Sequence, residues 1–220
     1  MLSIIEGANY VGKTTTLDIL KKKKSLITFY HPRFNDAQYY HFDYTVPETI
    51  RGLHVSDTLE KSTKATIHIP RDVVYQVSHM VCLKYLSSAK DKNILLDRCF
   101  LSEMVYNELY DKKIYEGFMG VLSSFNYKIF LLTVNNDEAL RKRVVERLKK
   151  DATKRYGIRD SKGFVPEPST IEEKMNSQRM IESKYKQFIE CFKLNCLEID
   201  TSDKTKKEVA DIICKEIFKK

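Results

Sequence analysis

Short apolar runs alternate along this chain with longer stretches in which apolar and polar positions are mixed. The apolar runs predict buried strands, and the mixed stretches have the spacing of amphipathic helices. The predicted strands are residues 2–6, 26–30, 93–97, 128–134 and 194–199. The predicted helices are residues 13–23, 70–89, 136–150, 170–191 and 205–218, with one more after the third strand. We therefore predict an α/β fold: a five-stranded parallel sheet with helices on both faces.

Length and composition narrow the class of protein. A chain of 220 residues with 42% hydrophobic residues is sufficient for one ample core. We therefore expect a single domain over residues 1–220. No apolar run approaches the roughly 20 residues that span a bilayer, and residues 1–6 lack the features of a signal peptide. These observations predict a cytoplasmic protein without membrane association. The formal net charge of +8 suits a polyanionic ligand without saying which one.

A phosphate-binding motif occupies residues 7–14, whose sequence GANYVGKT matches GxxxxGK[ST]. The motif follows a predicted strand and opens a predicted helix, which is the context of a P-loop. Backbone N–H groups of such a loop surround phosphate oxygens, Lys13 reaches the β- and γ-phosphates, and the Thr14 hydroxyl ligates Mg²⁺. The alternative is a glycine-rich turn with an incidental lysine. The residues that we expect to bind ATP are Gly7, Asn9, Tyr10, Val11, Gly12, Lys13, Thr14 and Thr15.

A second motif follows the third predicted strand. Its sequence, DRCFLSEMVY at residues 97–106, resembles the DRYxxSxxAY segment of thymidylate kinases, and Asp97, Arg98, Ser102 and Tyr106 keep the spacing. The start Ile5-Glu6-Gly7 is similar to the FEG start of that family, and residues 30–33 resemble its F-P-x-R stretch. Residues 139–143 resemble the helix that follows the fourth strand of that family, and residues 197–200 resemble the strand near its end. Residues 75–76, Tyr-Gln, resemble the Tyr/Phe-Gln pair that the related deoxynucleoside kinases have on the helix before their acid-Arg pair.

This resemblance implies a P-loop kinase that uses ATP and Mg²⁺, and it implies roles for individual residues. Arg33 would hold the acceptor phosphate, Arg98 would contact the transferring phosphoryl oxygens, and Asp97 would lie near Mg²⁺ or orient the acceptor. Tyr106 would pack where a ribose 2′-hydroxyl projects. The further residues that we expect on the acceptor side are Glu6, Gln76 and Ser102, with Gln76 able to pair with a base edge or simply to pack in the core.

The chain also departs from the family. Asn9 stands where the family usually has an aspartate that is associated with the sugar hydroxyl, and Tyr10 stands where some members have an arginine. We expect the missing charge to come from a basic lid at about residues 151–168, in which Arg155 and Arg159 close over the phosphates and exclude water. The alternative is a solvated basic loop. The acceptor region would span about residues 33–90.

The nature of the acceptor depends on the stretch after the second strand. A neutral hydroxyl needs a general base, but residues 31–33 are His-Pro-Arg, which suits an acceptor that is already anionic. We therefore predict a deoxynucleoside monophosphate kinase acting on thymidylate or a similar pyrimidine nucleotide. A deoxynucleoside kinase stays open, since Asn35-Asp36 is close by. A kinase or ATPase acting on nucleic-acid ends and a non-enzymatic nucleotide-binding regulator are further alternatives. We expect a small-molecule partner, not nucleic acid, and the sequence leaves a homodimer open.

Overall fold

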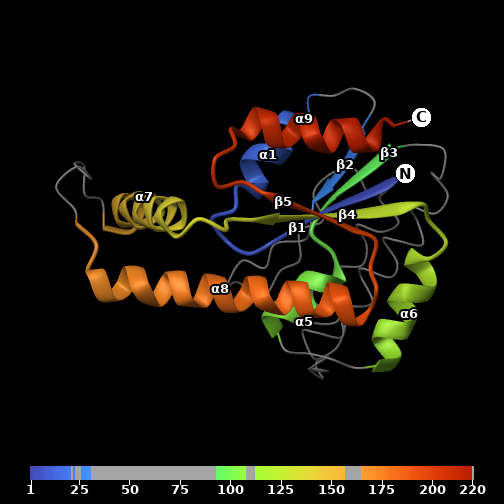
Figure 1. Ribbon diagram of the computed structural model, residues 1–220, viewed down its shortest axis with the longest axis horizontal. Helices are drawn as coiled ribbons and strands as arrows, with labels where there is room; N and C mark the ends of the chain where they lie inside the picture. Colours follow the sequence, from blue (N-terminus) through green and yellow to red (C-terminus); the bar gives the residue numbers. More distant parts are fainter. Residues whose placement is uncertain (21, 23–25, 31–92, 108–111, 157–164, 220) are drawn as a thin grey trace, which may run out of the picture. The chain divides into compact units, whose positions relative to one another are not determined.

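The structure is a computed structural model that describes residues 1–20, 22, 26–30, 93–107, 112–156 and 165–219 (Figure 1). Its strands are β1 (Leu2–Glu6), β2 (Leu26–Tyr30), β3 (Asn93–Asp97), β4 (Tyr127–Thr133) and β5 (Cys196–Asp200). They form a five-stranded sheet in the order β2-β3-β1-β4-β5. Its helices are α1 (Lys13–Leu20), α5 (Phe100–Asn107), α6 (Lys112–Leu122), α7 (Asp137–Tyr156), α8 (Pro168–Cys191) and α9 (Lys206–Ile217). The predicted α/β fold with a parallel sheet is confirmed.

The chain divides into two compact units. The first unit consists of Met1–Ile5 and Lys23–Lys128, and the second consists of Glu6–Lys22 and Ile129–Lys220. Each unit therefore contains segments that are far apart in the sequence. The division leaves our expectation of a single domain over the whole chain a prediction.

In the first unit, β3 pairs in parallel with both β1 and β2. The register places Asp97, the last residue of β3, beside Ile5 of β1 and Tyr30 of β2. The strands β1 and β3 are almost entirely buried, which explains why Ile4-Ile5 and Ile94-Leu95-Leu96 are consecutive apolar residues rather than alternating ones. Asp97 therefore lies at the carboxyl edge of the sheet, where parallel α/β sheets bind their ligands.

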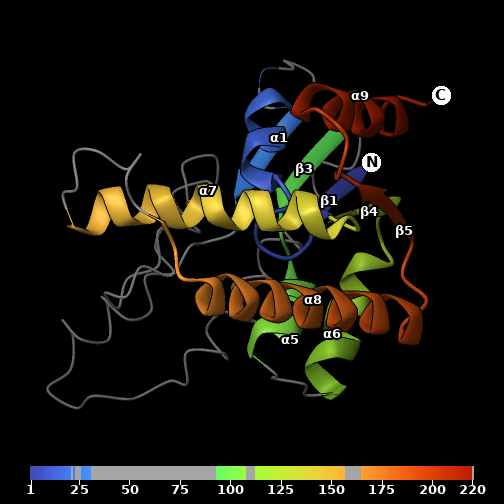
Figure 2. The ribbon, with the colours of Figure 1, turned by 60° about the vertical axis from the view of Figure 1, so that its left-hand side comes forward.

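In the second unit, β4 and β5 pair in parallel, with Thr133 beside Asp200 at their carboxyl ends. The helices α1 and α9 pack against each other on one face of these strands, and α8 lies on the other face (Figures 1 and 2). The side of α9 that is buried carries apolar residues at helical spacing: Val209, Ala210, Ile213 and Ile217. Burial of this stripe therefore fixes how α9 covers the sheet.

Several helix ends differ from those that the sequence predicts. Helix α1 ends at Leu20, because the Lys22 N–H donates to the Ile19 carbonyl in a tighter turn than an α-helix. Helix α7 continues to Tyr156, so the first part of the predicted lid, residues 151–156, is helical. An ion pair between Arg147 and Asp151, one turn apart, supports this extension. Helix α8 begins at Pro168, a residue that is favourable in the first turn.

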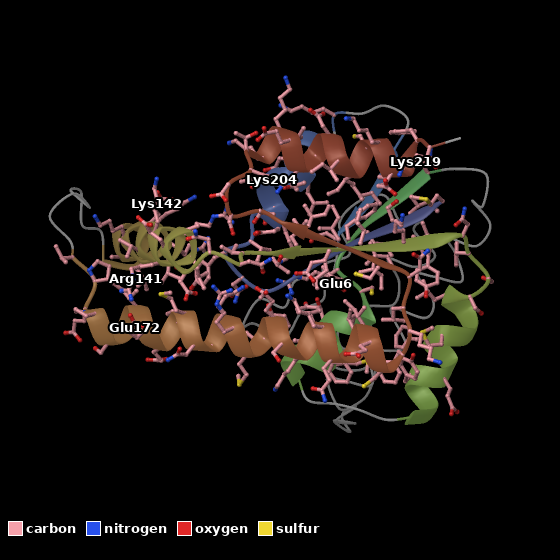
Figure 3. All side chains as sticks on the ribbon, viewed as in Figure 1. Glu6, Arg141, Lys142, Glu172, Lys204 and Lys219 are labelled. Atoms are coloured by element: carbon pink, nitrogen blue, oxygen red, sulfur yellow. The ribbon has the colours of Figure 1, made fainter. Side chains whose placement is uncertain are left out.

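Two ion pairs join α7 to α8 within the second unit. The Arg141 guanidinium of α7 contacts the Glu172 carboxylate of α8, and the two side chains point toward each other in Figure 3. Arg179 of α8 pairs with Asp137 at the first turn of α7 and also donates to the Val134 carbonyl before it. These contacts hold α7 and α8 together, the helices that precede and follow residues 157–164.

Some predicted features lie outside the described residues. They are the helix at 70–89, the acceptor region at 33–90 with Arg33 and Gln76, and the lid residue Arg159. Within the ranges that the structure describes, no helix combines the length and the apolar character needed to cross a membrane.

Candidate phosphate-binding site

The loop that follows β1 has a backbone that only particular residues can adopt. Gly7 has φ 134°, and a Cβ atom at this position would lie 2.4 Å from the carbonyl oxygen of Leu132 in β4. Gly12 has φ 90°, and Tyr10 has φ 64°, in the left-handed region that non-glycine residues seldom occupy. The glycines of the motif are therefore required by this fold, one by the close approach of β4 and the other by its backbone angle.

Lys13 lies at the start of α1, and its ammonium group turns back toward the loop. The buried Nζ donates a hydrogen bond to the Gly7 carbonyl, 2.7 Å away, and another to the Ala8 carbonyl. The Thr15 hydroxyl donates to the Gly12 carbonyl at 2.7 Å, and the Thr16 N–H donates to the same carbonyl at 3.0 Å, which begins the helix. The loop thus combines a fixed cation with a helix N-terminus, two features that attract a polyphosphate.

The back of the loop is held by Arg143 of α7 and by Thr201, the residue after β5. Arg143 Nη1 donates to the Thr201 hydroxyl at 2.8 Å and to the Tyr10 carbonyl at 3.3 Å, while Nη2 donates to the Thr201 carbonyl. The Thr201 hydroxyl lies 3.2 Å from the Val11 carbonyl and 2.8 Å from the Thr133 carbonyl, both of which can accept its hydrogen. Burial lowers the pKa of Arg143 from its ordinary value, partly offset by Asp200 and other carboxylates.

The turn that carries Thr201 is itself fixed by its neighbour Asp200. One carboxylate oxygen of Asp200 accepts from the Ser202 hydroxyl at 2.6 Å, the Ser202 N–H at 2.9 Å and the Asn135 N–H at 3.2 Å. Burial alone would raise the pKa of Asp200, but these hydrogen bonds together outweigh it and keep the pKa below its ordinary value. The Asn136 N–H in turn donates to the Ser202 hydroxyl. The turns after β4 and β5 are thus joined.

Glu6 occupies the last position of β1, directly before the loop. Its side chain is fully buried, and its carboxylate accepts a hydrogen bond from the hydroxyl of Tyr185 in α8, 3.2 Å away. Figure 3 shows Glu6 inside the second unit, between the strands and α8. The acceptor-side role that we expect for Glu6 stays a prediction.

The first unit contains the second motif, at residues 97–106. Asp97 is buried, and Arg98 after it has φ 69° while its N–H donates to the Ile5 carbonyl at 2.9 Å. A non-glycine residue in this conformation costs about 1–3 kcal/mol, and such residues gather at functional sites. The chain therefore turns sharply at Arg98, directly where β3 ends at the carboxyl edge of the sheet.

The side chain of Arg98 contacts two residues of α5, one and two turns along the helix. Its Nη1 donates to the Ser102 hydroxyl at 3.1 Å, and its guanidinium lies 5.1 Å from the centroid of the Tyr106 ring. The Tyr106 ring remains partly exposed, with 36% of its surface accessible, so it is not a core residue. The Arg98 side chain, which comes from the turn before α5, thus contacts two residues that lie four apart on the helix.

The residues proposed for Mg²⁺ fit the chemistry of that ion. Thr14 is exposed at the first turn of α1, and Asp97 offers a carboxylate at the end of β3. Among the described residues, no group of three or more His, Cys, Asp and Glu side chains could hold a metal ion. Mg²⁺ in phosphate sites is held by one or two protein oxygens with phosphates and water, so each of these oxygens is of a kind that the ion accepts.

The sequence did not identify Arg143 and Thr201 as site residues. Arg143 belongs to the stretch 139–143 that resembles thymidylate kinases, but nothing in its spacing connects it to a loop 133 residues earlier. Thr201 follows the fifth strand, and its position at the carboxyl edge of the sheet was the one available signal. Arg155 lies in α7, and its side-chain position is outside what the structure describes.

The sequence matches no protein-family model and no curated protein. Solved structures match along the whole chain. The YorR protein of Bacillus subtilis, solved in complex with phosphorylated GDP, is 15% identical with a TM-score of 0.57, over 99% of this chain and 95% of that one. Deoxyadenosine kinase of M. mycoides, solved with bound dATP, is 16% identical with a TM-score of 0.52, over 100% of both chains. Thymidylate kinase of Ehrlichia chaffeensis is 13% identical with a TM-score of 0.54, over 99% of this chain and 98% of that one. This chain therefore has the fold of the P-loop nucleotide kinases, which is the fold that the resemblance to thymidylate kinases predicted.

Proposed function

We propose that this chain transfers the γ-phosphate of ATP to a deoxynucleoside monophosphate, with thymidylate or a similar pyrimidine nucleotide as the acceptor. The observation that carries the proposal is the loop after β1. The buried ammonium group of Lys13 donates to the Gly7 and Ala8 carbonyls of this loop, which has residues with positive φ and leads into a helix N-terminus. A polyphosphate is the ligand that such an arrangement favours. The likeness to nucleotide kinases supports the same reaction class.

In this proposal the residues of the loop bind and orient the ATP phosphates. Backbone N–H groups of residues 7–15 donate to phosphate oxygens, and the Lys13 ammonium exchanges its bonds to the Gly7 and Ala8 carbonyls for bonds to the β- and γ-phosphates. The Thr14 hydroxyl and the Asp97 carboxylate are the groups that would hold Mg²⁺. When bound, Mg²⁺ supplies positive charge that offsets the charge developing on the phosphates.

The transfer step itself needs further cations, because an anionic acceptor must approach a polyanion. We assign this role to Arg98 on the transferring group and to Arg33 on the acceptor phosphate. Arg155 and Arg159 of the lid exclude water, which separates transfer from hydrolysis. Geometry supports the assignment of Arg98, because its contacts with Ser102 and Tyr106 fix its side chain. Its backbone also has a positive φ, a conformation that is common at functional sites. Arg33 and Arg159 rest on the sequence.

A deoxynucleoside kinase is the second candidate. The similarity to deoxyadenosine kinase of M. mycoides, which covers 100% of both chains, favours it. The two candidates differ in one chemical respect: a 5′-hydroxyl must lose a proton to a general base, whereas an acceptor phosphate needs only cations. Residues 35–36, Asn-Asp, would have to supply that base.

A coupled assay of ADP release tests the proposal. The purified chain is given ATP and Mg²⁺ with a panel of acceptors: the four deoxynucleosides, their monophosphates, the matching ribonucleotides and a DNA oligonucleotide with a free 5′-hydroxyl. We expect turnover with a pyrimidine deoxynucleoside monophosphate, and product identity is checked by mass spectrometry. Turnover only with nucleosides would favour the second candidate. ADP release without any acceptor, or with the oligonucleotide alone, would refute both.

A further inference from the structure

Two carbonyl groups of the phosphate loop are held from behind by Arg143 and Thr201, residues that lie outside the loop. The Tyr10 carbonyl accepts from Arg143 Nη1 at 3.3 Å, and the Val11 carbonyl faces the Thr201 hydroxyl at 3.2 Å. Both contacts lie within the second unit. We infer that Arg143 and Thr201 are positioning residues that orient the amide groups of the loop for phosphate binding. The inference rests on the proposed function, since it assumes that the loop binds a nucleotide.

The planarity of the peptide bond supplies the physical reason. In a trans peptide the carbonyl of one residue and the N–H of the next point in opposite directions. A carbonyl that is held on the outer side of the loop therefore turns the following N–H toward the inner side. Holding the Tyr10 carbonyl orients the Val11 N–H, and holding the Val11 carbonyl orients the Gly12 N–H. Inward N–H groups are what an anion-binding loop requires.

This orientation does not come without a restraint. Tyr10 has φ 64°, a conformation that a tyrosine without other contacts would leave for a commoner one. Gly12 has φ 90°, in the range that favours glycine, and a Cβ atom added there would meet the Thr15 hydroxyl at 3.5 Å. The contacts of Arg143 and Thr201 fall on the carbonyls of Tyr10 and Val11, which belong to the two peptide groups that join Tyr10 to Gly12. They therefore restrain the part of the loop that would otherwise change conformation most easily.

The restraining residues are themselves rigidly placed. The guanidinium of Arg143 forms a fork on the Thr201 hydroxyl and carbonyl, and the Thr201 N–H donates to the Thr133 carbonyl at 2.9 Å. The Thr201 hydroxyl has a single hydrogen, which the Thr133 and Val11 carbonyls share, while its oxygen accepts from Arg143. The geometry thus connects the ends of β4 and β5 to the loop through one side chain.

The test uses sodium tripolyphosphate as a probe, because it has no base or sugar, together with ATP. Affinities are measured by isothermal titration calorimetry, well below the melting temperature of each variant. Thr201→Val removes the hydroxyl with little change in shape, and Thr201→Ser retains it. We expect Thr201→Val to weaken both ligands by the same factor of about three- to tenfold, the value of one ordinary hydrogen bond. We expect Thr201→Ser to bind like the unmodified chain.

Arg143→Lys keeps the charge but loses the two-pronged contact, and we expect it to weaken both ligands by at least the same factor. Lys142→Ala is the matched control, because Lys142 is an exposed neighbour on the same helix, labelled in Figure 3, and should leave both affinities unchanged. Equal affinities in Thr201→Val and the unmodified chain, with only a lower melting temperature, would overturn the inference. So would an Arg143→Lys variant that loses affinity for ATP but keeps it for tripolyphosphate.

These outcomes are separable from those of the acceptor assay. A chain that binds tripolyphosphate through this arrangement but phosphorylates no acceptor refutes the proposed kinase activity and leaves the positioning role intact. A chain that phosphorylates its acceptor while Thr201→Val binds normally refutes the positioning role alone. A chain that phosphorylates its acceptor but binds no tripolyphosphate also refutes the positioning role.

Discussion

The Tyr185 hydroxyl donates a hydrogen bond to the carboxylate of Glu6 across 3.2 Å, and both side chains are fully buried. Tyr185 lies in α8, whereas Glu6 is the residue directly before the phosphate loop. A carboxylate in such a place depends on its hydrogen bonds, because burial without them disfavours the charged form. The pair therefore joins α8 to the start of the loop.

Tyr185→Phe removes this donor and leaves the ring in place. We expect the free energy of unfolding to fall by about 1–3 kcal/mol, the cost of taking a hydrogen bond from a buried polar group. Urea denaturation followed by circular dichroism measures the change. In a chain that already carries Glu6→Gln, Tyr185→Phe should lower the free energy of unfolding by less, because the charge that needs the hydroxyl is gone. A loss of acceptor affinity in Glu6→Gln without loss of stability would instead support the substrate-binding role that the resemblance implied.

Lys13→Ala should abolish phosphoryl transfer while the chain remains folded. The ammonium of Lys13 is the fixed cation of the loop, and removing one preorganised donor of this kind lowers kcat by about 100- to 1000-fold. The coupled ADP-release assay measures the loss, and circular dichroism checks the fold. Lys22→Ala serves as the control, since Lys22 is exposed in the turn after α1 and should behave like the unmodified chain. Near-normal turnover in Lys13→Ala would contradict the kinase proposal.

Gly7→Ala should destabilise the fold. The added Cβ would meet the Leu132 carbonyl oxygen at 2.4 Å, and φ 134° is a conformation that alanine rarely adopts. The backbone strain alone costs about 1–3 kcal/mol, and the clash adds to it. Thermal unfolding measures the effect. Gly120→Ala is the control: apart from its chain neighbours and the backbone of its own helix, no atom lies within 4 Å of the added group, so in helix α6 it should raise stability by roughly 0.5–1 kcal/mol. A Gly7→Ala chain as stable as the original would show that the loop can move away from β4.

The Asp200 carboxylate should make stability depend on pH in the acidic range. Its pKa is lowered in the folded chain from an ordinary value of 3.8. A lowered pKa means that its contribution is fully present above the unfolded pKa and is lost as pH falls through the folded value. Melting temperatures from pH 6 down to about pH 2 should therefore fall less steeply for Asp200→Asn than for the unmodified chain. Asp203→Asn removes an exposed carboxylate on the same turn and controls for the loss of one negative charge. Identical slopes for both variants would contradict the role given to Asp200.

Tyr106 should discriminate against ribonucleotides. The resemblance places this ring where a 2′-hydroxyl projects, and the structure shows it partly exposed and packed beside the Arg98 guanidinium. An added hydroxyl would clash or lose its hydrogen bonds, which costs about 1–3 kcal/mol. We expect Tyr106→Ala to raise kcat/KM for ribonucleotides relative to deoxyribonucleotides. Met104→Ala, a buried residue of the same helix, should lower stability without changing that ratio. An unchanged ratio in a stable Tyr106 variant would remove this residue from the sugar site.

The sequence by itself determined the features that depend on neighbours along the chain. The P-loop at residues 7–14 was predicted because glycine spacing, a preceding strand and a following helix are all local. The start of α7 was predicted in the same way, and the Asn136 side chain does accept from the Ala139 N–H at 2.9 Å. The motif that contains Arg98, Ser102 and Tyr106 was recognised from its spacing, which is also local, although their mutual contact was not predicted.

The tertiary structure alone decided which distant residues support these features. Thr201 lies 190 residues from Val11 in the sequence, and Arg143 lies 133 residues from Tyr10, so no periodic pattern relates them. They meet because β4 and β5 pair in register, which brings the turns after both strands to the carboxyl edge that the loop shares. Tertiary packing also decides the surroundings of Glu6. The Tyr185 hydroxyl, 179 residues later in the chain, donates to the Glu6 carboxylate, and both side chains are buried, which no local pattern indicates.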